Sequence, residues 1–371
     1  MQYFIIAGER SGDLHGSNLL KEILRLDEKA KARGIGGRFL REAGMEVLFD
    51  YEGIAIMGFT EIFEKFSLIK KTINLVKKEL SESKPDCVIL IDYGGFNLRI
   101  ARFAKTLGIK VFYYIPPKIW AWNTSRIEKL RASTDRIFVI LPFEKEFYQK
   151  HGIEVDYVGN PILDSIVSFE PKPDFRLRNR LDDKPIIAVL PGSRKSEIEK
   201  SLYRILSILP AYPDHLFVVA GVDNLPESYY NHFRRNGRVD IVFEQTYDLL
   251  HNAEMAVVTS GTATLETALF KVPQVVVYAT NSISYFLARL LIKVQYISLV
   301  NLIAGKKVVP ELIQDRFSPA NLRKELEAIN PGTKQRKEML LQYEEVKNKL
   351  GNAGASRRCA ELMVKRLQNQ Q

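Results

Sequence analysis

The chain has 371 residues, of which 46% are hydrophobic and 26% charged, and its formal net charge is +10. This composition is typical of globular proteins and excludes a fibrous, disordered or low-complexity chain. At about 100–200 residues a domain, the length predicts two domains, each able to bury its own core. Two cysteines cannot form a disulfide framework, and no run approaches the ~20 apolar residues that span a bilayer, so we expect a cytoplasmic protein.

In the first half of the chain, short β-branched runs alternate with helical patterns, which predicts βα units and a parallel sheet. Residues 87–91 are apolar at every position, as in a strand covered on both faces. A composition break at 169–174 predicts a linker and a domain boundary. The expected strands are Tyr3–Ala7, Cys87–Asp92, Lys110–Tyr114, Arg136–Leu141 and Val155–Val158.

The same alternation begins again after the break and predicts a second α/β domain, followed by helices at 318–329, 334–350 and 355–367. In open α/β sheets, ligands bind beyond the carboxyl ends of the strands. Two such domains facing each other would form a cleft for a large, two-part substrate. The strands expected here are Ile186–Leu190, Leu216–Ala220, Val239–Phe243, Met255–Val258 and Gln274–Val277.

Three glycines follow the first expected strand at intervals of four residues: Gly8, Gly12 and Gly16. Glycines let a backbone approach a ligand, and a following helix would point its N–H groups at negative charge. The spacing is neither the Gly-x-Gly-x-x-Gly dinucleotide fingerprint nor a phosphate-binding P-loop. The turn is therefore either part of a ligand site or a tight strand-to-helix connection capped by Ser11 or Asp13.

Two further strand ends carry distinctive residues. Asp92 closes a strand that we expect to be buried, where a carboxylate could accept a proton from a substrate hydroxyl; the alternative is that it caps the next helix. The segment after the strand at 110–114 holds both tryptophans of the chain, Trp120 and Trp122. These indoles would either line a ligand cleft or pack within a loop.

Two turns of the second half carry the strongest chemical signal. Arg194 follows Gly192 and Ser193 directly after a strand, and a guanidinium beside the N–H groups of a helix start is typical of a diphosphate site. A second turn offers hydroxyl and backbone donors, and a carboxylate lies one turn into the next helix. That carboxylate could accept from a sugar hydroxyl or compensate the helix dipole. The residues of this second turn are Ser260, Gly261, Thr262 and Glu266.

Residues 59–80 predict an amphipathic helix whose main apolar stripe faces the core. Leu68 and Leu75 fall on the opposite side, with Lys71 and Lys78 beside them. Exposed leucines flanked by lysines suit the surface of an anionic membrane, and we expect this face to bind it. The alternative is that the two leucines pack under a loop.

The five histidines show no metal-ligand spacing, so we expect neither a metal site nor a cofactor. The basic excess suits nucleic acid, an anionic membrane surface or phosphorylated substrates. The sequence has no zinc-finger spacing, no basic region with heptads and no RNA-binding aromatic signature. Nucleic acid is therefore not an expected partner.

Taken together and in order, the motifs resemble those of the lipid-A-disaccharide synthases, and the resemblance covers nearly the whole chain. Any one of the motifs would be a weak signal, whereas the ordered set is specific. The motifs that carry it are Gly8-Glu9-x-Ser11-Gly12-Asp13, Trp120-Ala121-Trp122, Leu141-Pro142-Phe143-Glu144, Leu190-Pro191-Gly192-Ser193-Arg194, Ser260-Gly261-Thr262-Ala263-Thr264-Leu265-Glu266, Asn301, Pro310-Glu311-Leu312 and Gln314.

The resemblance implies an inverting glycosyltransferase with two Rossmann-like domains facing across a cleft (GT-B-like) and C-terminal helices. It implies UDP-2,3-diacylglucosamine as the donor and 2,3-diacylglucosamine 1-phosphate as the acceptor. The products would be a β(1→6) tetraacyl disaccharide 1-phosphate and UDP, in lipid A biosynthesis. We expect an acceptor and membrane-side domain over 1–168, a UDP-sugar domain over 174–333, and helices over 334–371 that pack across the domains or onto a partner subunit. The protein would lie on the inner leaflet of the cytoplasmic membrane and could form a homodimer.

Asp92 is the expected catalytic base, with Glu9 and Asp13 as the alternatives. The other expected site residues bind substrate. They are Ser11, Gly12, Asn97, Trp120, Gly192, Ser193, Arg194, Ser260, Gly261, Thr262, Glu266, Asn301 and Gln314.

The chain departs from the family pattern at a few positions, which affects the finer acceptor contacts. These departures are Arg10, Gly95, Pro116, Asn160 and Val300. Two rival functions stand beside the synthase: a UDP-sugar epimerase of similar fold, which needs no surface for acyl chains, and a basic nucleic-acid-binding protein.

Overall fold

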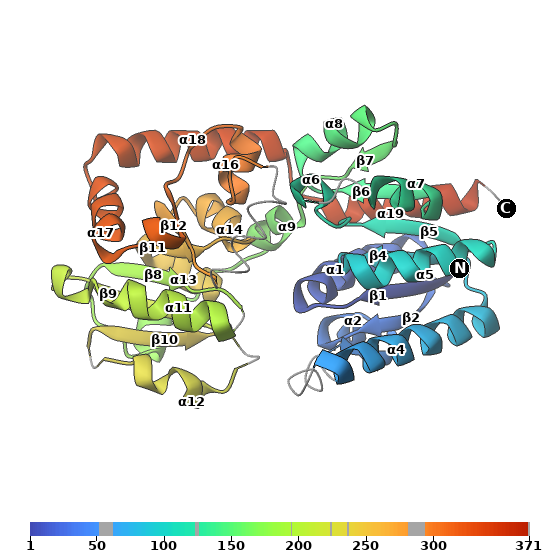
Figure 1. Cartoon of the computed structure of the whole chain (residues 1–371), viewed down its shortest axis with the longest axis horizontal. Coiled ribbons are helices and arrows are strands. Elements are labelled where there is room, and N and C mark those ends of the chain that lie inside the picture. Colours follow the sequence, from blue (N-terminus) through green and yellow to red (C-terminus); the bar gives the residue numbers. More distant parts are fainter. Residues whose placement is uncertain are drawn as a thin grey trace. The chain divides into compact units, whose positions relative to one another are not determined.

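The computed structural model describes residues 1–51, 62–122, 126–193, 195–222, 225–235, 237–280 and 294–369. The chain divides into two compact units. Unit 1 comprises Met1–Asp164 and Asn352–Gln371, and unit 2 comprises Ser165–Gly351 (Figure 1). The C-terminal segment therefore belongs to the same unit as the N-terminus.

Among the described residues, seven strands form the sheet of unit 1, in the order β3-β2-β1-β4-β5-β6-β7. All neighbouring pairs are parallel. From β1 the chain adds strands on one side, and from β4 it adds them on the other, so the topological switch point lies between β1 and β4. The strands are β1 (Gln2–Ala7), β2 (Lys31–Gly36), β3 (Glu46–Asp50), β4 (Cys87–Ile91), β5 (Lys110–Tyr114), β6 (Arg136–Val139) and β7 (Val155–Tyr157).

Helices cover both faces of this sheet (Figure 1). One face packs against α4, α5, α7 and α8, and the other against α1, α2 and α19. The helices of unit 1 are α1 (Arg10–Leu26), α2 (Arg38–Glu42), α4 (Ile62–Ser83), α5 (Gly94–Thr106), α6 (Ile119–Trp122), α7 (Ile127–Ser133), α8 (Pro142–Lys150) and α19 (Ala355–Gln368); α9 (Pro161–Val167) spans the boundary between the units.

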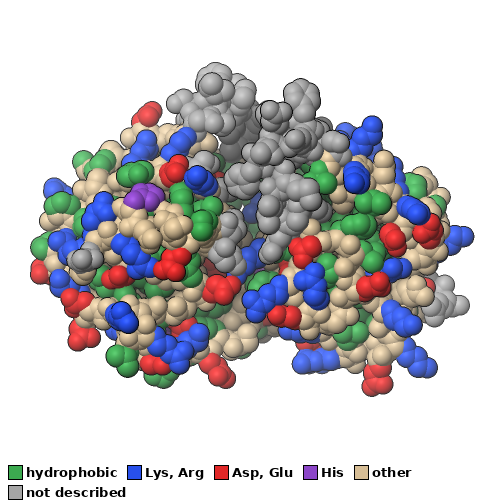
Figure 2. Space-filling view, turned by 90° about the horizontal axis from the view of Figure 1, so that it is seen from below, with side chains coloured by type: hydrophobic (Ala, Val, Ile, Leu, Met, Phe, Trp, Pro, Cys, Tyr) green, Lys and Arg blue, Asp and Glu red, His purple; other side chains and the backbone are tan. Residues whose placement is uncertain are grey.

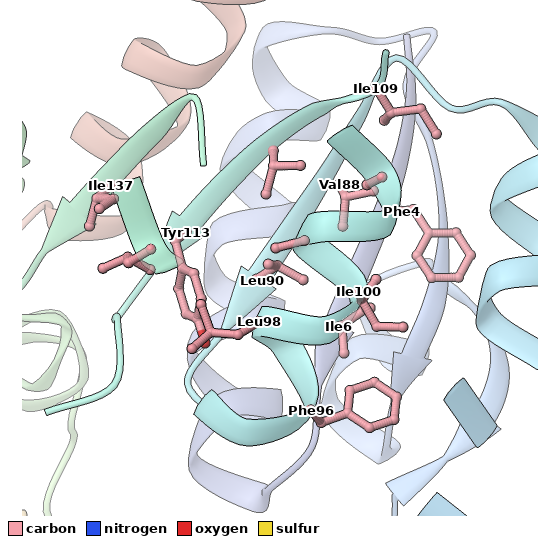
Figure 3. Close-up of a cluster of buried hydrophobic side chains, with 14 of the residues drawn as sticks. Phe4, Ile6, Val88, Leu90, Phe96, Leu98, Ile100, Ile109, Tyr113 and Ile137 are labelled. Carbon is pink, nitrogen blue, oxygen red and sulfur yellow. The ribbon is translucent and has the colours of Figure 1, made fainter. Parts of the chain in front are cut away.

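The two cores of unit 1 explain why its central strands are apolar at every position. Successive side chains of a strand point to opposite faces. Phe4 of β1 and Val88 of β4 enter the core under α5, where Figure 3 shows them beside Ile100. Their neighbours Ile5 and Ile89 enter the core under α1 and α19. Both faces of β1 and β4 are thus buried, as in a doubly wound sheet.

Unit 2 repeats the same topology. Among its described residues, six parallel strands form a sheet in the order β10-β9-β8-β11-β12-β13. The switch point lies between β8 and β11. The strands are β8 (Ile186–Leu190), β9 (Leu216–Gly221), β10 (Val239–Phe243), β11 (Ala253–Thr259), β12 (Gln274–Tyr278) and β13 (Glu311–Ile313). The helices are α10 (Phe175–Arg178), α11 (Lys195–Leu206), α12 (Glu227–Tyr230), α13 (Thr246–Asn252), α14 (Ala263–Leu269), α16 (Leu299–Ala304), α17 (Pro319–Ala328) and α18 (Lys334–Leu350), with short 3₁₀ turns at Leu209–Ala211, Asn231–Phe233 and Gln314–Arg316.

The expectation of two Rossmann-like α/β domains is confirmed, since every expected strand is present within a few residues. The sequence did not predict β2, β3 or β13. In β2, a Cβ on Gly34 would lie 2.0 Å from the backbone oxygen of Ile5 in β1, so the strand requires glycine at this position. Glycine has a low strand propensity, which hides the strand from a sequence pattern.

The segment expected to link the two halves belongs to unit 2. Phe169 packs edge-to-face on Tyr247 and Phe270, with ring centroids 5.6 and 5.5 Å apart. The backbone N–H of Lys172 donates to the carboxylate of Asp248 at 2.8 Å. These contacts hold the segment on unit 2, and the division of the chain falls earlier, between Asp164 and Ser165.

The two C-terminal helices pack on different units. Helix α18 lies against α14 and α16 of unit 2, and α19 lies against α1 of unit 1. The carboxylate of Asp164 accepts the backbone N–H groups of Gly354, Ala355 and Ser356, at distances from 2.5 to 3.1 Å. A carboxylate is the preferred partner for the N–H groups of a helix start, so these bonds stabilise α19 where the chain re-enters unit 1.

Candidate functional site

The first cluster of expected site residues lies at the switch point of unit 1. Glu9 follows β1 and Asp92 follows β4, and β1 and β4 are neighbours in the sheet. The carboxyl ends of parallel strands at a switch point are where open α/β sheets bind ligands. The topology therefore brings together two residues that are 83 positions apart in the sequence.

The backbone at Asp92 is unusual. Asp92 and Tyr93 both have φ of +47°, and Ile115, at the end of the adjacent strand β5, has φ of +57°. The backbone N–H of Asp92 donates to the carbonyl of Ile115 at 3.1 Å. Non-glycine residues in this region cost about 1–3 kcal/mol each and cluster at functional sites. A β-branched residue such as isoleucine is a clear outlier there.

Two side chains fix this strained turn. Both the Tyr113 hydroxyl and the Asn97 amide donate to the backbone carbonyl of Asp92 at 2.7 Å. Asn97, an expected substrate-binding residue, is fully buried, and its amide also donates to the carbonyl of Ile91. In this structure Asn97 therefore positions the backbone that carries Asp92.

The surroundings of Asp92 make its carboxyl a stronger proton acceptor than that of an exposed aspartate. Burial raises the pKa of its carboxyl above the usual value, and the Lys118 ammonium and the Tyr93 backbone N–H oppose this rise. A raised pKa brings a carboxylate closer to the pH at which general bases work well.

Gly8 and Glu9 lie against the same turn. A Cβ on Gly8 would stand 2.4 Å from the Tyr93 ring, so only glycine allows the ring to lie there. Burial raises the pKa of the Tyr93 hydroxyl, and the negative charge of Glu9 raises it further. Glu9 and the next site residue, Ser11, are exposed, and Gly12 is buried against Ile91 of β4.

Asp13, the other alternative base, has a structural role. Its side chain is fully buried, and its carboxylate accepts the backbone N–H groups of Gly37, Phe39 and Leu40 at 2.7, 2.9 and 3.2 Å. These bonds cap the start of α2. Among the described contacts, those of the Asp13 carboxylate are to this backbone, so Glu9 and Asp92 are the better-placed carboxylates.

Trp120 is buried: only 8% of its surface is exposed and could contact a ligand. Its indole N–H donates to Glu144 at 3.0 Å, and its ring meets Phe143 edge-to-face at 4.9 Å. Glu144 was part of a motif in the sequence, but nothing in the pattern gave it a role. The side chain of Trp122 lies outside the described residues.

The second cluster lies at the switch point of unit 2. Gly192 and Ser193 follow β8, and Ser260 follows the neighbouring strand β11. Gly192 has φ of +102°, which side-chain-bearing residues rarely adopt, so the turn after β8 requires glycine. Arg194, the expected diphosphate ligand, lies outside the described residues.

Contacts within unit 2 shape the turn after β11. The Ser260 hydroxyl donates to the carbonyl of Ile297 at 2.8 Å, while Gly261 is partly buried and Thr262 exposed. One turn into α14, Glu266 accepts the Tyr247 hydroxyl at 3.0 Å. Burial raises the pKa of Glu266, and this hydrogen bond opposes the rise.

Asn301 and Gln314 organise backbone beside this turn. Asn301 is fully buried, donates to the carbonyl of Val309 and to Glu311, and accepts the N–H groups of Val308 and Val309. Gln314 accepts the N–H of Thr280 at 3.2 Å and donates to the same residue's carbonyl at 3.3 Å. Asn301 therefore holds the backbone at Val308 and Val309 in place.

Glu311 is a residue of this region that sequence reasoning did not assign. Its carboxylate accepts the N–H groups of Ile297 and Ser298 and the hydroxyl of Ser298, at distances from 2.7 to 3.2 Å. Because Ile297 also accepts the Ser260 hydroxyl, Glu311 anchors the segment that supports the turn after β11. Its place in a Pro-Glu-Leu motif was the only signal.

A family model described as Lipid-A-disaccharide synthetase matches residues 3–364. The lipid-A-disaccharide synthase of Syntrophus aciditrophicus is 38% identical over 364 residues, covering 96% of this chain and 95% of that protein. That of Geobacter metallireducens is 36% identical over 370 residues, covering 98% and 96%. The chain belongs to the lipid-A-disaccharide synthase family. Membership confirms the resemblance drawn from the motifs and the expectation of an enzyme that forms the lipid A disaccharide.

Solved structures of other enzymes share the fold. UDP-GlcNAc 2-epimerase of Neisseria meningitidis, bound to UDP-GlcNAc, superposes with a TM-score of 0.65 at 14% identity and covers 100% of both chains. The Methanocaldococcus jannaschii enzyme, in complex with UDP-GlcNAc and UDP, gives 0.67 at 17% identity, covering 98% of this chain and 100% of that one. Identities this low show the fold alone. They confirm the GT-B-like pair of domains and add nothing for the epimerase rival.

The expected membrane face lies on α4, which the structure describes from Ile62; residues 59–61 of the predicted helix lie outside the described residues. Lys71 and Lys78 are exposed, Leu75 is 37% exposed, and Leu68 is partly buried. The side chains of residues 59–67, which begin the expected apolar stripe, lie outside the described residues. None of the described helices is long and apolar enough to cross a bilayer.

Within the described residues, no three His, Cys, Asp or Glu side chains gather closely enough to hold a metal ion. On the face that Figure 2 draws, Lys and Arg side chains are interspersed with Asp and Glu. That mixture differs from the single-sign stripe typical of nucleic-acid-binding surfaces.

Proposed function

We propose that this chain transfers 2,3-diacylglucosamine from its UDP carrier to the 6-hydroxyl of 2,3-diacylglucosamine 1-phosphate. The products are the β(1→6) tetraacyl disaccharide 1-phosphate and UDP. The observation that carries the proposal is the family match over residues 3–364. It is supported by two clusters of polar residues, one at the switch point of each Rossmann-like unit, where such sheets bind ligands.

Asp92 acts as the general base in this proposal. It accepts the proton of the acceptor hydroxyl while the hydroxyl oxygen attacks the anomeric carbon of the donor, and the bond to the UDP oxygen breaks with its electron pair. A single in-line displacement inverts the anomeric centre and needs one base. The raised pKa of Asp92 and its fixed, strained backbone support this role over that of Asp13. Glu9 is the alternative base.

The turns of unit 2 bind the leaving diphosphate. Gly192, Ser193 and the turn at 260–262 offer backbone and hydroxyl donors, and Arg194 supplies a cation. Donors aimed at charge that develops on a leaving group stabilise the transition state, and no cofactor enters this scheme. Glu266 accepts from the donor sugar.

The direct test is turnover of the purified protein with both acylated sugars, followed by UDP release and by mass analysis of the disaccharide. The synthase releases UDP only when the acceptor is present. An epimerase converts the donor alone, and UDP released without disaccharide means hydrolysis. Either of these two results contradicts the proposed function.

The protein also associates with the inner leaflet of the cytoplasmic membrane in this proposal, because both sugars carry acyl chains. A shallow groove between α4 and α5 supports it: four of its lining residues are cations, and none is acidic. None of the four forms an ion pair within the part of the chain that the structure describes. They are Lys70, Lys77, Arg99 and Arg102. Each cation near an anionic surface contributes about 1 kcal/mol.

Vesicle co-sedimentation tests the membrane face. A Leu75→Ser/Lys78→Glu variant should pellet less with anionic vesicles than the unaltered chain, and salt should release the unaltered chain. Lys150→Glu, on α8, is a matched control that changes an exposed lysine elsewhere in unit 1. Equal pelleting of all three proteins, insensitive to salt, would place the membrane face elsewhere. The proposal also includes a homodimer, and sedimentation at micromolar concentration tests it; a monomer at that concentration would remove it.

A further inference from the structure

Glu144 is a buried carboxylate beside the expected acceptor side of the site. It lies at the start of α8, just after β6, and only 2% of its surface is exposed. One of its oxygens accepts the indole N–H of Trp120 at 3.0 Å. The other accepts the backbone N–H groups of Ile140 and Leu141 at 3.2 and 3.0 Å.

A simple helix-capping role does not account for this arrangement. A glutamate in the first turn often bonds back to the residue before the helix, as Glu144 does to Leu141. Glutamate is, however, almost never fully buried unless it is paired. A carboxylate loses solvation on burial, a cost that an exposed cap avoids. The buried Glu144 carboxylate makes a further hydrogen bond that a cap does not need, to Trp120, which lies 24 residues earlier in the chain.

The segment that Glu144 holds lies next to Asp92. Strands β4, β5 and β6 are neighbours, and Asp92, the Trp120 segment and Glu144 follow their carboxyl ends in that order. The strained residue Ile115, which accepts the backbone N–H of Asp92, begins the segment that continues to Trp120. Lys118 lies between them on this segment, and its charge acts on both Asp92 and Glu144.

We propose that Glu144 is a positioning residue: through Trp120 it fixes the segment 115–120, and so sets the position of Lys118 and of the backbone that supports Asp92. The inference rests on the proposed role of Asp92 as the base. Glu144 itself does not touch a substrate in this scheme.

The protonation state of Glu144 modulates this positioning. Burial raises its pKa to about 7, although the Trp120 N–H, two backbone N–H groups and the Lys118 ammonium all favour the ionised form. The hydroxyls of Tyr148 on α8 and Tyr157 on β7 also face this charge. Once the carboxyl is protonated, one of its oxygens carries a hydrogen and becomes a donor. The three N–H groups that bond to the carboxylate, from Trp120, Ile140 and Leu141, then find fewer acceptor sites. The Trp120 segment is therefore held less firmly below neutral pH.

The activity test compares Glu144→Gln with Trp120→Phe, which keeps an aromatic ring but removes the N–H. Each variant should lower kcat/KM for the acceptor about tenfold and leave the affinity for UDP unchanged, because UDP binds the turns of unit 2. The double variant should be no worse than either single variant, because both disturb the same contact: Trp120→Phe removes the donor, and Glu144→Gln leaves one acceptor oxygen for three donors. The step near pH 7 in the acceptor kcat/KM profile should disappear in Glu144→Gln. Effects that multiply, or a pH profile that is the same in Glu144→Gln as in the unaltered chain, would overturn the inference; any step that comes from Asp92 itself remains in both proteins.

A second measurement does not depend on turnover, so it separates failure of this inference from failure of the proposed function. In a Trp122→Phe background, Trp120 is the sole tryptophan of the chain. Its emission should change with a midpoint near pH 7, and Glu144→Gln should abolish that change and increase quenching by acrylamide. Glu146→Gln is the matched control, because Glu146 lies exposed on the same helix. Identical emission and quenching in the Glu144→Gln and control proteins at every pH would refute the contact's role, as would a change that survives in Glu144→Gln.

Discussion

Replacing Asp92 by Asn separates catalysis from folding. Asparagine has almost the same shape and adopts positive φ at least as readily as aspartate, so the backbone at +47° is retained. The amide cannot accept a proton at neutral pH. General-base catalysis contributes about 10²–10⁴ in rate, or about 3–5 kcal/mol of barrier. We expect turnover to fall by that factor while UDP affinity stays within about twofold, because the expected UDP ligands lie on unit 2.

The stability of the Asp92→Asn protein is the internal control. Burial raises the pKa of Asp92 in the folded chain above its value in the unfolded chain. The free energy of unfolding therefore falls as the pH rises from the pKa of the unfolded state through that of the folded state. Asparagine carries no such charge, so the variant should unfold at the same or a slightly higher temperature at pH 7. Turnover within about threefold of the unaltered chain would refute the base assignment and move attention to Glu9. Lost activity together with lost folding would contradict the structural argument.

Three further predictions concern the other expected site and core residues. Asp13→Asn should lower the free energy of unfolding by about 1–3 kcal/mol, because its amide faces backbone N–H groups that the carboxylate now accepts; thermal denaturation measures it. Arg194→Ala and Glu266→Ala should each weaken UDP-sugar use by about 1.5–3 kcal/mol, and changes below twofold in both UDP affinity and turnover would remove the assignment. Gly34→Ala should destabilise unit 1 by more than about 1 kcal/mol, as denaturant unfolding can show, because its Cβ would meet the oxygen of Ile5 at 2.0 Å.

The strands that the sequence predicted share one property: they are buried on both faces of their sheets. Burial of this kind produces runs such as Cys87–Ile91 and Ile186–Leu190, which are apolar at each position. The missed strand β2 contains two glycines, a lysine and an arginine. Its place in the sheet depends on the close approach of Gly34 to β1, which is a tertiary contact. Local propensity cannot report such a contact.

The positions of the candidate site residues in the fold could be predicted better than their contacts. The structure places these motifs at strand ends as expected, because both the motifs and the ends of apolar runs are local features. Roles depend on partners far away in sequence. Asp13 accepts N–H groups 24 to 27 residues later, and Trp120 donates to a carboxylate 24 residues later. Neither pairing leaves a periodic signal, so the spacing alone left the cap and the ligand readings open for Asp13.

The strained residues of unit 1 point to the same candidate site independently of any motif. Lys84 lies next to a helix end, where one residue of positive φ often reverses the chain. Asp92, Tyr93 and Ile115 differ, because they follow two adjacent central strands and are tied together by the hydrogen bond between Asp92 and Ile115. At about 1–3 kcal/mol each, three such residues cost a sizeable part of the 5–15 kcal/mol by which a domain is usually stable. The buried cores on both faces of β4 and β5 offset that cost, and the proposed role of Asp92 as the base, which needs a carboxylate held in one position, gives a reason for strain of this size.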